Sequence, residues 1–211
     1  MRWGYGLIAL FVNAGAARAM DAGPVTLLAL GDSLTAGYNL PAANAFPVRL
    51  ESALRNAGYN VRVINAGVSG DTTADGRARL DWALADKPDA AIVELGANDA
   101  LRGLAPAMAF ANLDAILGTL SDRRIPVLLA GMRAPRNMGA DYVRSFDGLY
   151  PRLAAKWKVP LYPFFLEGVA LHPDLTQPDG LHPTAQGVDR IVGSILPQVE
   201  ALIGPTAKAS R

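Results

Sequence analysis

The segment VTLLALGDSL, residues 25–34, decides the fold. Its first part, Val25–Leu30, is a short apolar run of the kind that forms a strand buried on both faces of a parallel sheet. Gly31 ends the run, and polar residues follow at once. Four further segments have the same character, and they are Val61–Ile64, Ala90–Leu95, Pro126–Ala130 and, more weakly, Val159–Tyr162.

Between these segments, apolar residues recur at helical spacing. Strands that alternate with helices pair in parallel through right-handed crossovers, with helices on both faces. The sequence therefore predicts a three-layer α/β/α sandwich around a parallel sheet of about five strands, and the order 2-1-3-4-5 would bring its polar strand ends together. The predicted helices are Phe46–Gly58, Thr72–Leu84, the segment around Leu113–Leu120, Asp141–Trp157 and Val188–Val199, the last with a bend at Pro197.

The first twenty residues, MRWGYGLIALFVNAGAARAM, have the features of a secretory signal peptide. Arg2 precedes an apolar segment, Leu7–Val12, and Ala17–Ala19 has the small-x-small form of a cleavage site. A membrane span needs about 20 apolar residues, so this segment is too short to serve as a stable membrane anchor. We predict a signal peptide over residues 1–19, export of the protein, and a single domain over residues 20–211.

The composition excludes several classes of function. With 20 Lys+Arg against 19 Asp+Glu and no long basic run, nothing indicates a nucleic-acid partner. The sequence has no Cys, which excludes disulfides, thiolate metal sites and a cysteine nucleophile. His172 and His182 are too few for a histidine-rich metal centre. We expect a monomer that acts on a small molecule without a cofactor or a metal.

Polar residues gather where the predicted strands end. The first strand runs into Gly31–Leu34, the second into Asn65–Asp71 and the third into Gly96–Asp99, while Asp179–His182 precedes the last helix. The carboxyl ends of parallel strands form the usual ligand site of an open α/β sheet. We therefore expect these four clusters to meet at one site.

Together the clusters contain the parts of an acyl-transfer site. Ser33 is a candidate nucleophile, His182 can take its proton, and Asp179 can orient the His182 ring and stabilise its charged form. A tetrahedral intermediate also needs hydrogen-bond donors. The backbone N–H groups of Ser33 and Gly70 and the side-chain amide of Asn98 can supply them.

Each cluster alone also has a simpler interpretation. Asp32 or Ser33 could cap a helix, and the other clusters are common in turns. Two other functions stay open at this point: a metal-dependent phosphoesterase that uses Asp32, Asp71, Asp99 and His182, and a non-catalytic exported binding protein on the same fold. In a phosphoesterase, Ser33 would have no role, and the metal site would have His182 as its only histidine ligand.

In this order, GDSL at 31–34, Gly70, GAND at 96–99 and DGLH at 179–182 resemble the four sequence blocks of the GDSL or SGNH hydrolases. Longer stretches, among them GDSLTAGYNL, INAGVSGDTTADGRARL and VELGANDALRG, resemble a bacterial periplasmic group of multifunctional acyl-CoA thioesterases, arylesterases and lysophospholipases. The resemblance implies a flavodoxin-like α/β/α fold and a periplasmic serine esterase. It also implies that Ser33, Gly70, Asn98 and His182 are the signature residues and that Asp179 completes the triad.

The substrate is less closely defined. We expect an acyl ester or thioester, and a carbohydrate or other small-acyl deacetylase on the same fold is the alternative. Leu40, Pro41, Phe46 and the loop 132–138 (MRAPRNM) are candidates to line an acyl groove. The resemblance implies that the loop after the fourth strand is mobile and touches the acyl chain. A solvated surface loop is the simpler interpretation. The loop residues predicted to contact substrate are Met132, Arg133, Pro135 and Met138.

Overall fold

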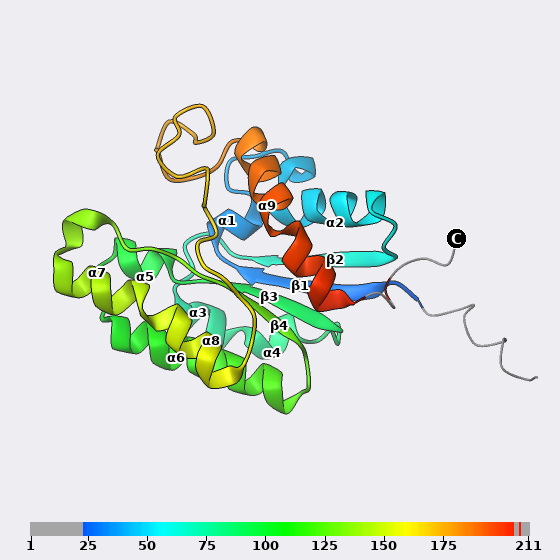
Figure 1. Cartoon of the computed structure of the whole chain (residues 1–211), viewed down its shortest axis with the longest axis horizontal. Helices are drawn as coiled ribbons and strands as arrows, with labels where there is room; N and C mark the ends of the chain where they lie inside the picture. The colour runs from blue at the N-terminus through cyan, green and yellow to red at the C-terminus, as the bar shows by residue number, and fades with distance from the viewer. Residues whose placement is uncertain (1–22, 205–206, 208–211) are drawn as a thin grey trace, which may run out of the picture.

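Five parallel strands form one sheet in the order β2-β1-β3-β4-β5, as predicted (Figure 1). The computed structural model describes residues 23–204 and residue 207, so the predicted signal peptide lies outside the described residues. The strands are β1 (Val25–Gly31), β2 (Val61–Gly67), β3 (Ala90–Glu94), β4 (Val127–Ala130) and β5 (Leu161–Tyr162).

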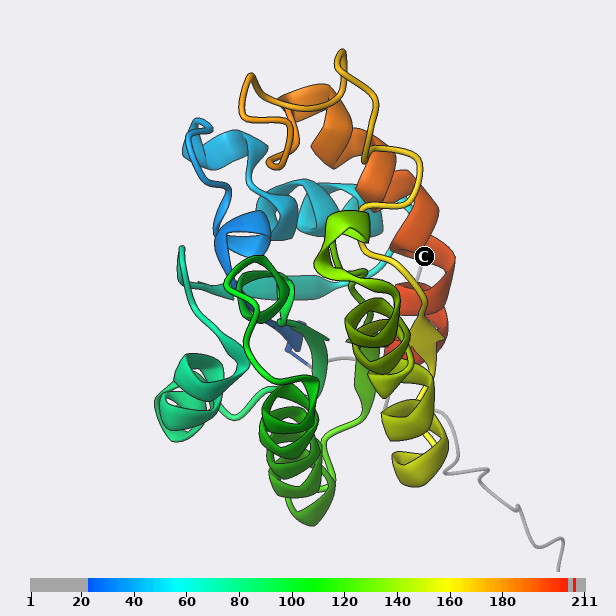
Figure 2. The same ribbon diagram turned by 90° about the vertical axis from the view of Figure 1, so that its left-hand side faces the viewer.

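Helices cover both faces of the sheet and complete the predicted three-layer α/β/α sandwich, which Figure 2 shows from a second side. In Figure 1, α1, α2 and α9 lie on one face, and α3, α4, α6 and α8 lie on the other. The helices are α1 (Ser33–Ala36), α2 (Phe46–Asn56), α3 (Thr73–Ala78), α4 (Leu80–Ala83), α5 (Ala97–Leu101), α6 (Pro106–Asp122), α7 (Ala140–Asp147), α8 (Leu149–Trp157) and α9 (Ala185–Ile203), with short 3-10 helices η1 (Ala42–Asn44) and η2 (Arg136–Met138). None of the helices in residues 23–204 is long and apolar enough to cross a membrane.

The hydrophobic core lies on both faces of the central strands β1 and β3. Every residue of β3 is buried, and so are Leu27–Gly31 of β1, because helices cover both faces of these strands. The edge strand β2 is only partly buried. On one face, α2 and α9 pack against each other and bury Phe46, Leu50 and Ile191 completely. Each such side chain contributes about 1.5–3 kcal/mol of burial free energy.

Two predicted helices are each divided in the structure. The predicted helix Thr72–Leu84 breaks at Arg79, whose guanidinium turns inward to bind Asp71 and the carbonyl of Gly31. The predicted helix Asp141–Trp157 breaks at Gly148, which ends α7 and precedes α8. The fifth strand is also shorter than predicted and contains only Leu161–Tyr162.

The register of the sheet brings three strand ends to one level. Gly31, the last residue of β1, lies opposite Gly67 at the end of β2 and Glu94 at the end of β3. α1 follows β1 directly and packs against the end of β2 so closely that a Cβ on Gly67 would lie 2.2 Å from the backbone nitrogen of Ala36. The polar segments that leave these three strands are therefore neighbours at the carboxyl edge.

Candidate active site

Ser33 is the first residue of the short helix α1, directly beyond the carboxyl end of β1. Asp32 caps this helix, because its Oδ1 accepts a hydrogen bond of 3.0 Å from the backbone N–H of Leu34. Gly37 ends the helix in the left-handed conformation, with φ of 82°. Asp32 therefore has the capping role that the sequence suggested. This cap holds Ser33 at the carboxyl edge of the sheet.

Ser33, His182 and Asp179 are hydrogen-bonded in series. The Nε2 atom of His182 lies 2.9 Å from the Oγ of Ser33, and its Nδ1 lies 2.7 Å from the Oδ2 of Asp179. The other oxygen of Asp179 accepts bonds from the backbone N–H groups of Leu181 and His182. Gly180 has a positive φ of 68°, which allows the turn that folds Asp179 back onto His182.

These bonds determine the charge state of Asp179. Partial burial raises the pKa of this carboxyl, but the backbone N–H groups of His182 and Leu181 and the His182 ring lower it more, to about 2. Asp179 is therefore a carboxylate at neutral pH, next to a ring nitrogen that it can orient.

The predicted hydrogen-bond donors Gly70 and Asn98 belong to the segments that follow β2 and β3, and Asn98 contacts the residue before Ser33. The Nδ2 of Asn98 donates to the carbonyl of Asp71 at 2.9 Å and to the Oδ2 of Asp32 at 3.3 Å, which places Asn98 next to the segment that carries Ser33. Gly70 has a φ of 89°, and its carbonyl accepts a bond of 2.8 Å from Arg102. Arg102 was not predicted from the sequence, because its partner is 32 residues away.

Two buried acids, Asp32 and Glu94, lie next to α1, the helix that begins at Ser33. Burial raises the pKa of Asp32 to about 6, although the Leu34 N–H and His182 favour its charged form. Burial and then the nearby Asp32 charge raise the pKa of Glu94 well above its ordinary range. Glu94 accepts a bond of 2.7 Å from the Oγ1 of Thr35, while its Oε1 has no partner. Glu94 was not singled out in the sequence, where it lies inside the predicted apolar strand Ala90–Leu95; in the structure it is the last residue of β3.

The carboxylates considered for a metal site have separate protein partners. Asp71 pairs with Arg79 at 2.6 Å. Asp99 accepts bonds from the backbone N–H and the hydroxyl of Thr73. Within the described part of the chain, no group of three or more His, Asp or Glu side chains is placed to hold a metal ion.

The predicted substrate-binding residues have different environments. Met132 is only 3% exposed and packs in the core, whereas Arg133 is exposed, pairs with Glu167 and lies over the ring of Phe164. Met138 reaches the segment between α5 and α6, where its Cε would lie 3.2 Å from a Cβ on Gly103. Leu40 and Pro135 are half-buried, and Pro41 is exposed.

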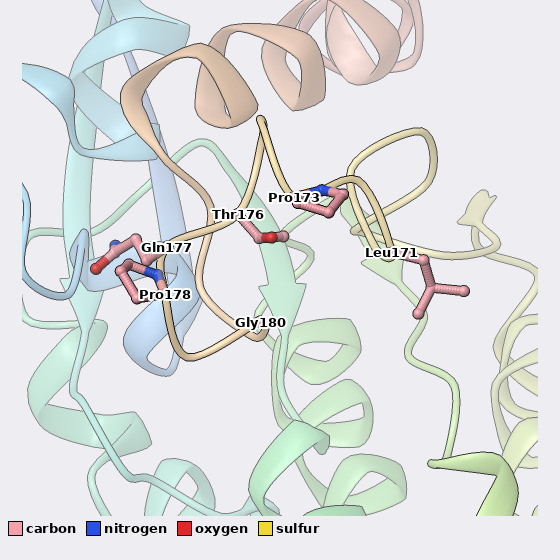
Figure 3. A pocket seen from close by; sticks show the side chains of 6 residues that line it. All are labelled: Leu171, Pro173, Thr176, Gln177, Pro178 and Gly180. Carbon is pink, nitrogen blue, oxygen red and sulfur yellow. The ribbon is translucent and has the colours of Figure 1, made fainter.

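The loop that carries Asp179 and His182 also encloses a hollow of about 490 Å³ (Figure 3). Its lining consists of Leu171, Pro173, Thr176, Gln177, Pro178 and Gly180. All six belong to one loop, and none of them is Ser33, Asp179 or His182. The hollow is therefore lined by neighbours of the hydrogen-bonded side chains and not by those side chains themselves.

This fold, with its polar site at the carboxyl edge of a parallel sheet, places the chain among the α/β/α proteins that bind their ligands at that edge. The chain belongs to the GDSL-like Lipase/Acylhydrolase family, whose sequence model matches residues 29–190. That match includes all four sequence blocks described above.

Similar proteins are named for the hydrolysis of esters and thioesters. An arylesterase from Vibrio mimicus is 42% identical over 178 residues, which span 84% of this chain and 87% of the relative. Thioesterase 1/protease 1/lysophospholipase L1 of Escherichia coli K12 is 40% identical over 179 residues, 84% of this chain and 85% of the relative. The crystal structure of AlinE4, an SGNH-hydrolase family esterase, is 54% identical, with a TM-score of 0.73, and covers 88% of this chain and 99% of its own. The chain is a hydrolase of carboxylic ester or thioester bonds.

Proposed function

We propose that this hydrolase is a serine esterase and thioesterase that acts through an acyl-enzyme. The Oγ of Ser33 attacks the acyl carbonyl while the Nε2 of His182 takes the hydroxyl proton. The carboxylate of Asp179 stabilises the charged ring that results. The tetrahedral intermediate collapses as His182 gives that proton to the leaving alcohol or thiol. His182 then activates a water molecule, which releases the acid and restores Ser33.

One observation carries this proposal: the unbroken series of hydrogen bonds from Asp179 through His182 to Ser33. A serine hydroxyl is a poor nucleophile unless a base accepts its proton, and the base needs a partner that fixes its tautomer. The distances of 2.9 Å and 2.7 Å support both roles. The N–H groups of Ser33 and Gly70 and the amide of Asn98 are the donors we propose for the oxyanion.

For substrates, we propose arylesters, acyl thioesters and lysophospholipids, because the relatives' names include all three classes. Leu40, Pro41, Arg133, Pro135 and Met138 are the proposed contacts to the acyl chain. Met132 is buried, so we propose that it packs beneath these residues and supports them from the core. Export, removal of residues 1–19 and a monomeric state belong to the same proposal.

The test compares the protein without residues 1–19 with its Ser33→Ala variant on p-nitrophenyl esters from acetyl to palmitoyl and on acyl-CoA. We expect turnover that Ser33→Ala nearly abolishes and stoichiometric labelling of Ser33 by a fluorophosphonate. An optimum at acetyl would favour the small-acyl deacetylase, and an optimum at longer chains would favour the fatty-acyl enzyme. Ordinary turnover by Ser33→Ala in a clean preparation would overturn the assignment of the nucleophile.

A further inference from the structure

Ser33 and His182 are 149 residues apart and belong to different segments. Ser33 follows β1, whereas His182 lies in the loop between β5 and α9. The backbone pairing of the sheet does not include this loop, so other contacts must fix the distance between the two side chains. The loop itself is closed at its base by an isolated bridge between Thr176 and Pro183.

One side chain, Gln177, connects the two segments. Its Nε2 donates to the carbonyl of Tyr38 at 2.9 Å and to the carbonyl of Pro183 at 3.0 Å. Its Oε1 accepts a bond of 3.2 Å from the Nδ2 of Asn39. Figure 3 shows this side chain at the opposite end of the loop from Leu171. Gln177 thus binds both the segment after α1 and the residue that follows His182.

Backbone bonds extend this connection to the reacting residues. The backbone N–H of Gln177 donates to the carbonyl of His182 at 2.7 Å, and the N–H of Tyr38 donates to the carbonyl of Ser33 at 3.0 Å. The ring of Tyr38 also lies against the His182 ring, with 4.5 Å between centroids. The path from Ser33 through Tyr38 and Gln177 to His182 therefore consists of direct contacts at every step.

The chemistry of this position requires an amide. Two carbonyl oxygens need two hydrogens on one nitrogen, and the Asn39 side chain needs an acceptor oxygen. Asn39 adopts the left-handed conformation, with φ of 58°, which asparagine tolerates better than most residues. A carboxylate of the same size would place oxygen against the carbonyls of Tyr38 and Pro183, with no hydrogen between them.

We infer that Gln177 is a positioning residue that sets the distance between His182 and Ser33, an inference that rests on the proposed function of these two side chains. The side chain of Gln177 bonds to Tyr38, Asn39 and Pro183 and not to the Oγ of Ser33 or the ring of His182. It acts by holding the His182 loop against the Tyr38 segment. A displacement of about 1 Å in a reacting group can reduce the rate by about 100-fold, so loss of this bridge should act on kcat.

The test uses two variants, Gln177→Ala and the isosteric Gln177→Glu, in the protein without residues 1–19. Gln186→Ala is the matched control, because Gln186 is an exposed glutamine in the first turn of α9, nine residues further along. For each protein we would measure kcat and KM on one p-nitrophenyl ester, the melting temperature, and both the rate and the endpoint of fluorophosphonate labelling. The endpoint counts active sites, so kcat can be expressed per site.

We expect both Gln177 variants to lose about 10- to 100-fold in kcat per site, with KM changed less than threefold and a parallel loss in labelling rate. Gln186→Ala should match the wild type. A fall in melting temperature with kcat per site and labelling rate unchanged would overturn the inference, because Gln177 would then be merely structural. Ser33→Ala, assayed in parallel, separates the two proposals. If that variant keeps ordinary turnover, the proposed function fails; if it is inactive while the Gln177 variants are normal, only the positioning role fails.

Discussion

Asn98 is held in place by two hydrogen bonds of different strength. The bond to the carbonyl of Asp71, at 2.9 Å, fixes the direction of the amide, whereas the contact to Asp32, at 3.3 Å, is longer. The longer contact is the one that a developing oxyanion could replace at small cost. Asn98 would then stabilise the transition state more than the bound ester, as catalysis requires.

Asn98→Ala should therefore lower kcat by about 10²–10³ while KM changes little, because the lost interaction belongs to the transition state. Steady-state kinetics on a p-nitrophenyl ester would measure both constants. Asn56→Ala is the control, since Asn56 is an exposed asparagine at the end of α2. A rise in KM with unchanged kcat would contradict the oxyanion role.

The low pKa of Asp179 leads to a prediction about pH. Because its pKa is about 2, the carboxylate stays charged across the range from pH 5 to pH 8. Asp179→Asn should lower kcat/KM by about 10⁴, as expected when the base loses the partner that sets its tautomer. The loss should be present at every pH in this range, because the wild-type carboxylate is charged throughout it. A variant as active as the wild type near pH 5 would contradict a charged Asp179 at that pH.

Two glycines, one at the end of β2 and one in α9, differ in whether the structure has room for a side chain. Gly67 ends β2, and a Cβ there would lie 2.2 Å from the backbone nitrogen of Ala36. Gly193 is exposed within α9, where a Cβ would meet no atom within 4 Å. Gly67 is thus required for α1 to pack on the sheet, whereas Gly193 is not required for packing.

Gly67→Ala should be strongly destabilising, by more than the roughly 1–3 kcal/mol of ordinary overpacking, because the obstructing atom is backbone. Gly193→Ala should stabilise the protein by about 0.5–1 kcal/mol, because alanine favours the helix. Urea unfolding of both variants would measure these free energies. Equal effects of the two substitutions would contradict the close contact between α1 and β2.

The sequence predicted least well those helices whose first or last residue depends on contacts with residues far away in the chain. The apolar pattern of Thr72–Leu84 is helical throughout, but Arg79 binds Asp71 and the carbonyl of Gly31, which is 48 residues away. Local periodicity contains no information about such a partner. The four-residue helix α1 is too short to show a periodicity of its own.

For the whole molecule, the order of the strands was predictable because alternating strands and helices permit few arrangements. Ser33, His182 and Asp179 could be predicted because each stands at a strand end or directly before the last helix. Gln177 could not, since its side-chain partners Tyr38 and Asn39 are 139 and 138 residues away, and nothing in the sequence marks these contacts. The proximity of the candidate site residues was thus easier to predict from the sequence than the side-chain contacts around them.

The buried acids at the carboxyl edge make the stability of the whole molecule depend on pH. Glu94 has a folded-state pKa well above its ordinary value of 4.5, so between these two values the folded chain keeps a proton that the unfolded chain has released. The free energy of unfolding therefore falls as the pH rises, by about 1.4 kcal/mol per pH unit for each such proton. Between pH 3.8 and about 6, the raised pKa of Asp32 likewise lowers the free energy of unfolding as the pH rises. The lowered pKa of Asp179 has the opposite effect, and only below pH 3.8.

Glu94→Gln removes this proton uptake and keeps an oxygen that can accept the bond from Thr35. We expect the variant to gain stability relative to the wild type as the pH rises above 4.5, by up to about 1.4 kcal/mol per pH unit until the folded-state pKa of Glu94 is reached. Urea unfolding at several pH values would measure the difference, and data well below pH 4.5 provide the internal reference, because position 94 is then uncharged in the folded and the unfolded chains. A difference that stays constant across the whole range would mean that Glu94 is ionised in the folded protein, and the fold would then hold a buried carboxylate next to Asp32.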